Sequence, residues 1–472
     1  MAFLTEAANR GSVSTGYDID NSLKLEPDNS EFLSITNTSE GSKRTATYSF
    51  WLKRTELDAS SYMQVAGLFN TGETVRFMFY QDHIMLENGW GGTRKRLTTN
   101  AVYRDTSAFY HFVVAIDTTQ STASNRVKLY VNGVQETSFS TEEYPDQNFD
   151  LAIGRSGANF PWRYGGYNAT YYKTAGYLAE AHYIDGTQYA ASDFGEFDPV
   201  SGIWKPIEFT GNYGTQGSYL NFSDASNLGA NPKGSDIDAV LNNITSADQS
   251  TDTPTNNFCT LNPLIHYAVQ SGTPVISEGS TKHNGSGGWT GMKGTIGVNK
   301  GKWYWELRTN SGTGAELIHG IQTVTSLSTS GEATATSAHN LLETAAWYVN
   351  GGHWIKDETS GRDDIAAGSI TQTYGNSVIH AVALNMDDGE ITYYANGSVV
   401  SGLNQVDLDG LAGETVAPFA SVYNQQVLWN FGGYTSITIS SAASDANGYG
   451  TFEYAPPSGY YALCSKNLAE FG

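Results

Sequence analysis

The sequence predicts an all-β protein made of two tandem antiparallel β-sandwiches with an N-terminal arm. Two observations support this fold class. With 51 Gly and 29 Tyr among 472 residues, and 16% charged residues, the composition is typical of short strands joined by many turns. A strand–turn–strand signature also occurs once in each half of the chain, which indicates two domains of similar class.

The repeated signature ends each time in Asn-Gly. The first copy covers residues 111–134 and the second covers residues 380–398. In both, Asn132-Gly133 and Asn396-Gly397 follow a strand rich in apolar and aromatic residues. Because Asn and Gly tolerate positive φ, each pair closes a two-residue turn and starts another strand.

Strand patterns follow one another through the first half at short, regular spacing, as in a sandwich. They are expected at residues 22–26, 31–36, 46–54, 75–80, 83–87, 111–134, 151–154 and 176–184. Residues 185–258 are rich in Gly, Asn, Asp and Ser, and we expect an extension that wraps the first sandwich. Within it, residues 236–241 are expected to form a short helical turn.

Further strands are expected in the second half, at residues 302–307, 317–322, 346–349, 380–385, 391–395, 419–423 and 427–431. No segment of the chain has a convincing helical pattern or a coiled-coil heptad. We therefore expect an arm at residues 1–19, a sandwich at 20–190, the wrapping extension and connector at 191–261, and a second sandwich at 262–472.

The net charge of −22 argues against a protein that binds nucleic acid or an anionic membrane surface. The short basic cluster Arg94-Lys95-Arg96 is expected on a solvated loop. The two cysteines, Cys259 and Cys464, provide no metal-ligand spacing. We expect buried free thiols, and a disulfide bridge between the two is the alternative. We find no signal peptide and no apolar run long enough to span a bilayer, so synthesis in the cytoplasm is expected.

Segments of both halves resemble known families. In the first half, residues 22–25, 48–54, 110–115, 127–133 and 176–180 resemble the laminin-G-like or concanavalin-A-like jelly roll. The second half resembles a SPRY-like sandwich at residues 301–306, 320–321, 382–389, 391–397, 418–419 and 430–432. These resemblances imply binding domains, although sandwich folds host many functions.

The combination is similar to a group of tailed-phage virion proteins, with similar openings at residues 10–23 and similar endings at residues 455–464. The resemblance implies a non-enzymatic protein on the virion surface. The favoured role is a tail fibre or spike component that binds a host-surface glycan or protein. The alternative is a capsid decoration or head-fibre protein. The implied partners are other virion proteins and further copies of the chain, without nucleic acid and without membrane insertion.

The densest aromatic segment, residues 160–172, provides the first candidate binding residues: Trp162, Tyr164, Tyr167 and Tyr171. Aromatic rings on a loop can stack on sugar faces or anchor a protein interface. The alternative, which is favoured over sugar binding, is that the loop folds back and buries its own rings or packs against another subunit.

Two further loops supply the remaining candidates. Trp90 and Arg94 lie in a Gly-rich segment, and His353 and Trp354 lie in a segment of the second half that corresponds to partner-binding loops of SPRY domains. For each loop, an ordinary exposed connection is the alternative interpretation.

The sequence argues against catalysis. Glycosidases of concanavalin-like folds use paired carboxylates, and Glu196-Phe197-Asp198 lacks a third acid and is followed by Pro199. Glycan hydrolysis is kept only as a residual alternative. The nine histidines form no metal-binding or nucleophile motif.

No cofactor is expected, and calcium is the one ion that the sequence leaves open. Hard oxygen ligands occur at Asp363-Asp364, Asp387-Asp388 and Asp407-Leu408-Asp409. None of these matches an EF-hand loop, and turn chemistry alone explains Asp387-Asp388-Gly389.

Overall fold

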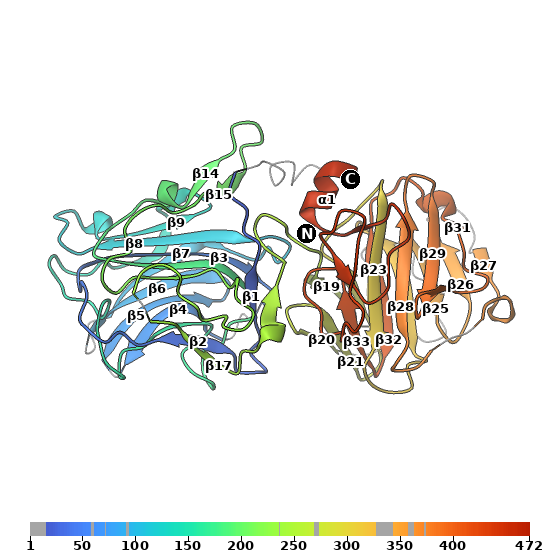
Figure 1. Cartoon of the computed structure of the whole chain (residues 1–472), viewed down its shortest axis with the longest axis horizontal. Coiled ribbons are helices and arrows are strands. Elements are labelled where there is room, and N and C mark those ends of the chain that lie inside the picture. The colour runs from blue at the N-terminus through green and yellow to red at the C-terminus, as the bar shows by residue number, and fades with distance from the viewer. Residues whose placement is uncertain are drawn as a thin grey trace. The chain divides into compact units, whose positions relative to one another are not determined.

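The chain divides into two units, residues 14–255 and residues 256–472 (Figure 1). Each unit contains two large, mainly antiparallel sheets, so the prediction of an all-β fold with tandem sandwiches is confirmed. The computed structural model describes residues 16–57, 61–70, 72–90, 94–235, 237–268, 273–326, 343–356, 363–371 and 374–472.

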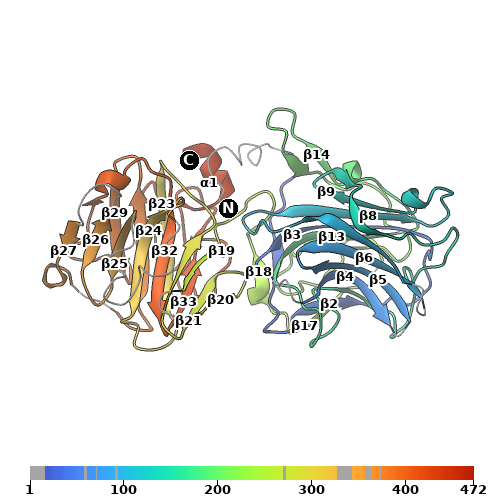
Figure 2. The same ribbon diagram turned by 180° about the vertical axis from the view of Figure 1, so that it is seen from behind.

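In the first unit, two sheets of similar size face each other as layers (Figures 1 and 2). The back sheet has the order β10 (Val134–Glu136), β9 (Val127–Val131), β8 (Tyr110–Asp117), β3 (Thr45–Arg54), β13 (Gly176–Asp185), β1 (Ser22–Leu25) and β18 (Gln249–Ser250), with β16 (Ser218–Leu220) beside β13. The front sheet has the order β11 (Phe139–Glu142), β7 (Lys95–Val102), β6 (His83–Trp90), β5 (Glu73–Tyr80), β4 (Met63–Asn70), β12 (Trp162–Tyr164), β2 (Phe32–Ile35) and β17 (Val240–Asn242). Outside these sheets lie the hairpin β14 (Gly195–Phe197) and β15 (Trp204–Pro206) and the short 3-10 helices η2 (Ala123–Asn125), η3 (Ala191–Asp193) and η4 (Ser246–Asp248).

Strand β3 illustrates how the alternating sequence pattern becomes a core. Phe50 and Leu52 point between the two sheets and are fully buried. Trp51 and Lys53 lie on the other face of the strand, yet they are buried as well. One reason is that the segment after the sandwich packs over this face, where Lys53 Nζ lies 2.9 Å from Asp252 Oδ2.

The segment that follows the first sandwich contributes strands to both sheets. Its strand β17 pairs with β2 of the front sheet, and its strands β16 and β18 pair with β13 and β1 of the back sheet. The expectation of a helical turn at residues 236–241 is wrong, because Val240–Asn242 form β17. Cross-strand pairing in this stretch outweighs its weak local helical pattern.

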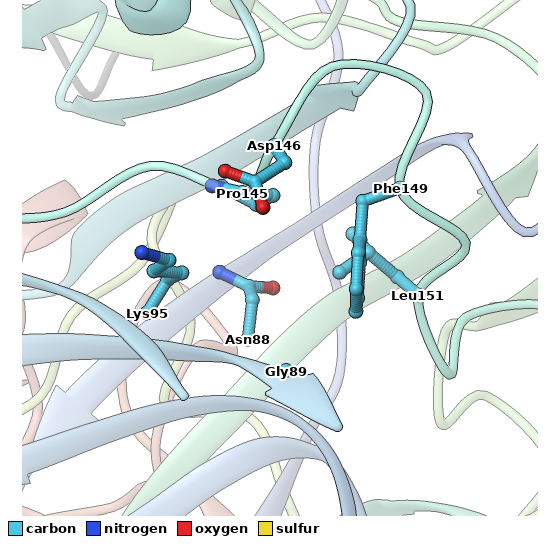
Figure 3. Close-up of a pocket in the computed structure, with 7 residues that line it drawn as sticks. All are labelled: Asn88, Gly89, Lys95, Pro145, Asp146, Phe149 and Leu151. Atoms are coloured by element: carbon cyan, nitrogen blue, oxygen red, sulfur yellow. The ribbon is translucent and has the colours of Figure 1, made fainter. Parts of the chain in front are cut away.

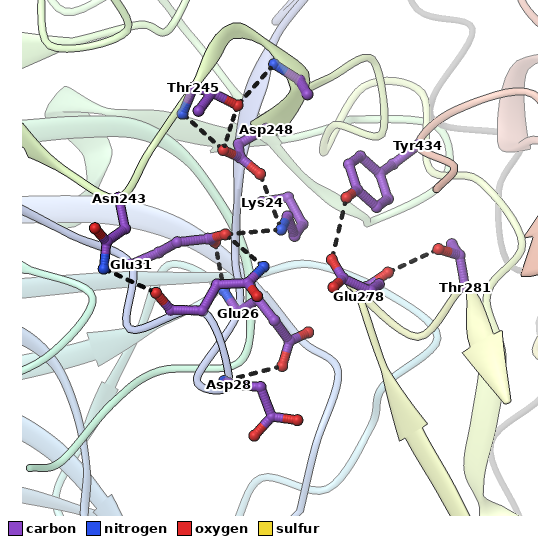
Figure 4. A network of polar contacts seen from close by, with 12 residues as sticks. Lys24, Glu26, Asp28, Glu31, Asn243, Thr245, Asp248, Glu278, Thr281 and Tyr434 are labelled. Atoms are coloured by element: carbon purple, nitrogen blue, oxygen red, sulfur yellow. Dashed lines mark hydrogen bonds and ion pairs between the residues drawn. The ribbon is translucent and has the colours of Figure 1, made fainter. Parts of the chain in front are cut away.

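A buried ion triad holds part of this segment against the first strands. Figure 4 shows the Lys24 ammonium between two carboxylates, with Nζ 3.1 Å from Glu31 Oε1 and 2.9 Å from Asp248 Oδ1. Asp248 also accepts a hydrogen bond from the backbone N–H of Thr245 at 2.8 Å, which caps η4. All three charged side chains of the triad are buried. Each charge therefore needs its partner to offset the free-energy cost of leaving water.

The second unit has the same general plan, with two main sheets. The first sheet has the order β19 (Leu261–Ala268), β22 (Trp289–Gly294), β32 (Val416–Tyr423), β24 (Leu317–Thr323), β25 (Thr344–Tyr348), β26 (His353–Lys356) and β27 (Asp363–Ile365). The second has the order β20 (Thr273–Ser277), β21 (Lys282–Ser286), β33 (Gln426–Asn430), β23 (Lys302–Thr309), β28 (Ile379–Asn385), β29 (Glu390–Ala395) and β30 (Ser398–Val399), with β31 (Val406–Asp407) beside β29 and β36 (Tyr461–Ala462) beside β23. Smaller elements are the pair β34 (Ala443–Ser444) and β35 (Thr451–Phe452) and the 3-10 helices η6 (Ala367–Ser369) and η7 (Asp409–Leu411).

Both predicted Asn-Gly turns are present. Asn132 and Asn396 have φ of 48° and 46°, and the glycines that follow have φ of 80° and 76°. The side-chain oxygen of each Asn also accepts a hydrogen bond from the first strand of its hairpin, at 2.7 Å from His111 N of β8 and at 3.0 Å from Ile379 N of β28. The signature therefore produces the same local structure in both units, a hairpin followed by a third short strand.

One helix, α1 (Ser465–Phe471), was not predicted from the sequence, and it lies near the C-terminus (Figure 1). Seven residues are too few for a helical period to emerge from the sequence. Asn467 of α1 donates a hydrogen bond to Asp445 Oδ2 at 2.8 Å, so tertiary contacts help to hold the helix. The expectation of buried free thiols is confirmed for Cys259 and Cys464, and burial raises the pKa of Cys464 to about 12.

Candidate functional site

The outer face of the front sheet carries charged residues that lie opposite one another on neighbouring strands. Glu87 on β6 pairs directly with Arg76 on β5 and with Arg96 on β7. The row continues through Gly67 on β4, which is opposite both Arg76 and Arg163 of β12. Because side chains alternate along a strand, the neighbours of these residues fill the core while the row itself faces outward. We call this row and the side chains that surround it the arginine face.

Three guanidinium groups converge on the carboxylate of Glu87. Arg76 Nη2 lies 2.8 Å from Oε1, Arg96 Nη2 lies 3.0 Å from Oε2, and Arg94 Nε lies 3.5 Å from Oε1. Glu87 and Arg76 are buried, whereas the side chains of Arg94 and Arg96 are 38% and 41% exposed. Burial by itself raises the pKa of Glu87, but the arginines outweigh burial and lower that pKa, so the carboxylate is ionised.

Aromatic rings surround these charges. Tyr62 and Tyr80 stack with their ring centres 4.4 Å apart. The guanidinium of Arg76 lies 4.8 Å from the centre of the Phe69 ring and 5.5 Å from that of Tyr172. Such cation–π contacts orient a guanidinium and leave the rings as flat apolar surfaces beside a charge.

Arg163 stands apart from the other arginines of this face, because it has no carboxylate partner among the residues that the structure describes. Its guanidinium lies 5.5 Å from the centre of the Tyr167 ring. Its Nε is buried without a hydrogen-bond partner, and burial lowers the pKa of the group. A partly desolvated cation therefore lies on this face, and none of the carboxylates that the structure describes neutralises it.

The surface beside Arg94 and Arg96 forms an open hollow of about 470 Å³. This volume is within the range of about 300–1,000 Å³ that is typical of small-molecule sites. Its lining is largely polar and consists of Tyr80, Gln81, His83, Met85, Arg94, Arg96, Thr98, Ser140, Thr141 and Glu143.

A second, much smaller pocket of about 20 Å³ lies at the end of β6 (Figure 3). Asn88 points toward the segment that contains Pro145 and Asp146, and its Oδ1 is buried without a hydrogen-bond partner. A cavity of this size has room for about one water molecule. It is therefore too small to be a ligand site.

The four candidate residues of the aromatic segment differ in how exposed their side chains are. Trp162 and Tyr164 lie on β12, point into the core and are 7% and 0% exposed. Their rings are not surface groups, in agreement with the alternative that the segment buries its own rings. Tyr167 is half-buried beside Arg163, and Tyr171 is 58% exposed. Of the four, Tyr167 contacts the arginine face, and Tyr171 offers the most exposed ring.

The other candidates also differ in accessibility. Arg94 belongs to the arginine face, and Trp90 ends β6 with a side chain outside what the structure describes. His353 and Trp354 begin β26 rather than forming a loop, and both are buried. His353 Nε2 lies 3.2 Å from the hydroxyl of Tyr393 inside the second unit. These two residues do not present a surface to a partner.

Sequence reasoning missed Arg76, Glu87 and Arg96. It placed the basic cluster at residues 94–96 on a solvated loop, which is wrong for Lys95 and Arg96 because β7 begins at Lys95. Alternation along β7 puts Arg96 on the same face as Glu87. The missed signal is that three successive strands each place one charged residue, Arg76, Glu87 or Arg96, on the face that points away from the core.

Two of the aspartates considered for calcium accept hydrogen bonds from backbone N–H groups. Asp387 Oδ1 accepts a hydrogen bond from Gly301 N at 2.8 Å, and Asp407 Oδ1 accepts one from Asp409 N at 2.9 Å. Asp363 and Asp364 lie on β27, and their side chains are outside the described set. Among described residues, no group of three His, Cys, Asp or Glu side chains is arranged to hold a metal ion.

Comparison with known proteins agrees with this architecture. Residues 27–171 match the family described as the Concanavalin A-like lectin/glucanases superfamily, and the first unit has a lectin-like β-sandwich fold. No curated protein matches the chain. No described helix is long and apolar enough to cross a membrane.

Parts of the chain are similar to solved structures. The SPRY domain of human HERC1 is 13% identical with a TM-score of 0.27, and the match covers 36% of this chain and 96% of that domain. A putative carbohydrate binding protein from Bacteroides ovatus is 13% identical with a TM-score of 0.33, covering 48% of this chain and 59% of that protein. A pentraxin from Limulus polyphemus is 12% identical with a TM-score of 0.30, and the match covers 48% of this chain and 95% of the pentraxin chain.

Proposed function

We propose that this is a non-enzymatic binding protein whose first unit binds carbohydrate on the arginine face. The observation that carries the proposal is the open hollow on the outer face of the front sheet, beside exposed guanidinium groups and aromatic rings. Sugars are recognised by rings that stack on their apolar faces and by polar groups that bond their hydroxyls. The arginine face offers both kinds of group, with Arg96 on β7 and Tyr80 on β5.

The chemistry of the hollow favours binding over hydrolysis. A glycosidase needs a carboxylic acid that holds a proton near neutral pH and a second carboxylate close to it. Glu87 is ion-paired with three arginines, which lower its pKa, so it is a poor proton donor. Glu143 is exposed, and it is the one carboxylate among the described residues that line the hollow.

The carbohydrate proposal is tested with the full-length protein and a set of soluble polysaccharides. Tyr80→Ala removes a ring of the hollow, and Tyr423→Ala removes an exposed ring of the second unit as the matched control. We expect at least about tenfold weaker binding for Tyr80→Ala, since stacking on one ring contributes roughly 1–3 kcal/mol by analogy with base stacking. Less than twofold change is expected for the control. Absence of binding to every polysaccharide, or wild-type affinity of Tyr80→Ala, would contradict the proposal.

We further propose that the protein is carried on the surface of a tailed-phage particle, as a tail fibre or spike component. The support is the resemblance of residues 10–23 and 455–464 to virion proteins that combine these two kinds of domain. The second candidate role is capsid decoration, since the same resemblance does not distinguish tail from head. In either role the second unit is proposed to contact other virion proteins, and the chain is proposed to assemble with further copies of itself.

Electron microscopy of purified particles labelled with an antibody against the second unit tests this assignment. Label at the tail is expected for a host-binding fibre or spike. Label spread over the head would replace the tail role with capsid decoration. Unlabelled intact particles would contradict the virion assignment, without affecting the carbohydrate test of the isolated protein.

A further inference from the structure

We infer that the arginine face selects acidic glycan chains, whose carboxylate or sulfate groups pair with its guanidinium groups. This inference rests on the proposed function, because it names the class of carbohydrate that the face would bind. It is carried by a local excess of positive charge within a chain whose net charge is −22.

The first observation is the imbalance around Glu87. One carboxylate is shared by three guanidinium groups, of which Arg94 and Arg96 are partly exposed. A guanidinium carries five N–H donors, so pairing with one shared carboxylate leaves donors on both exposed arginines. Arginine presents these donors in a planar fork that matches a carboxylate or a sulfate.

The second, independent observation is Arg163. It lies on another strand of the same face, it is half-buried, and no described carboxylate pairs with it. Its Nε is buried without a hydrogen-bond partner. A half-buried charge has lost part of its hydration, and an opposite charge from a ligand would replace what it has lost. An anionic group bound here would compensate that cation.

The spacing of the arginines favours a chain over a single small anion. From Arg163 on β12 to Arg96 on β7, the row crosses four strand intervals. Because neighbouring strands are about 4.8 Å apart, the two ends of the row lie roughly 19 Å from each other. Tyr167 lies near one end and Tyr80 lines the hollow at the other, so sugar rings can stack beside the charges.

The rest of the molecule argues against a polynucleotide as the anionic ligand. The net charge of −22 repels any polyanion, and it repels double-stranded nucleic acid with its dense phosphates most strongly. An acidic glycan also presents hydroxyl groups and apolar ring faces, which match the polar lining of the hollow and the aromatic rings of the arginine face. The observations therefore favour a glycan with spaced acidic groups.

The inference is tested by measuring the affinity of the full-length protein for four polymers: polygalacturonate, dextran sulfate, neutral dextran and poly-glutamate. Single-stranded DNA serves as a fifth probe. We expect binding to the two acidic polysaccharides, with an affinity that falls as salt is raised. At the same concentrations, at least tenfold weaker binding is expected for dextran, poly-glutamate and DNA.

Two variants connect the affinity to the named residues. Arg94→Gln combined with Arg96→Gln is expected to weaken binding to polygalacturonate at least tenfold. Arg163→Gln is expected to weaken it several-fold and removes no ion pair with a described residue, so its folding is not at risk. The control is Arg44→Gln, which removes an exposed arginine paired with Asp150 and is expected to change affinity less than twofold.

The outcomes separate the inference from the function on which it rests. Dextran bound as tightly as polygalacturonate, with no effect of the arginine variants, would overturn the inference and leave carbohydrate binding in place. Preferential binding of DNA or poly-glutamate would also overturn it. If no polysaccharide binds at all, the proposed function itself fails.

Discussion

Asn132 and Asn396 each have two roles in their turns. The backbone of each residue has positive φ, which most side chains adopt only with strain. Each side-chain amide oxygen also accepts a hydrogen bond from a backbone N–H on the first strand of its hairpin, β8 or β28. The two residues occupy equivalent positions in different units, so each one serves as a probe of its own sandwich.

Replacing either asparagine with Ala is expected to lower the free energy of unfolding of its unit by about 2–3 kcal/mol. Ala loses a hydrogen bond worth about 1 kcal/mol and adds backbone strain of about 1–2 kcal/mol. Denaturant unfolding followed by tryptophan fluorescence measures the loss. Asn132→Gly and Asn396→Gly, which tolerate the positive φ, are the controls and are expected to lose less. Alanine variants as stable as the wild type would show that neither role matters.

At the scale of elements, the segment after the first sandwich is bound to it by strand pairing and by buried ions. β17 and β18 extend the two sheets, and the Lys24 ammonium joins Glu31 of the sandwich to Asp248 of η4 (Figure 4). Burial raises the pKa of Glu31, although Lys24 lowers it. Lys24 is thus the charge that makes burial of both carboxylates tolerable.

Lys24→Met is expected to destabilise the first unit by about 3–5 kcal/mol, because it leaves two buried carboxylates without their cation. Limited proteolysis should then cut within residues 221–255 at a lower protease concentration, and the unfolding midpoint should fall. Arg44→Met breaks the exposed pair with Asp150 and is expected to cost about 0–1 kcal/mol. Equal effects of the two substitutions would show that the triad does not hold the segment.

Part of the arginine face could be predicted from the sequence, because some of its residues lie on strands that are neighbours in the chain. Residues 75–80 and 83–87 are predicted strands, and the two-residue turn between them places Arg76 directly opposite Glu87. That pair follows from local sequence. Arg96 does not, since the pairing of β6 with β7 contains a register shift that the sequence does not reveal. Arg163 comes from a distant part of the chain, and its position depends on long-range strand order.

At the scale of the whole molecule, both units contain histidines that are buried in the neutral form. His319 and His380 come from the two facing sheets of the second unit, and their ring centres are 5.2 Å apart. Burial lowers the pKa of His380 to about 3 and that of His319 well below its usual value. In the first unit, burial also lowers the pKa of His111 to about 3.

Stability is therefore expected to fall as the pH drops below about 6.5, where histidines of the unfolded chain take up protons and the buried ones do not. Each such histidine costs about 2 kcal/mol at pH 5 relative to pH 7. Burial raises the pKa of Glu306. Protonation of this carboxyl group therefore favours the folded state as the pH falls, which opposes the effect of the histidines.

Thermal unfolding at pH 7 and at pH 5 measures this dependence. His319→Gln combined with His380→Gln is expected to make the second unit less sensitive to pH. An unchanged difference between the two pH values in that variant would assign the sensitivity to other groups.

The amino-acid sequence by itself determined the all-β class, the alternating strands, the Asn-Gly turns and the burial of both cysteines. These features depend on side-chain period, turn chemistry and hydrophobicity, which act over short stretches of chain. Only the tertiary structure decided that Trp162, Tyr164 and Trp354 lie in cores, while Arg96 and Arg163 share an outer face. The physical reason is that the register between strands, and the face on which each side chain emerges, are set by packing of segments far apart in sequence.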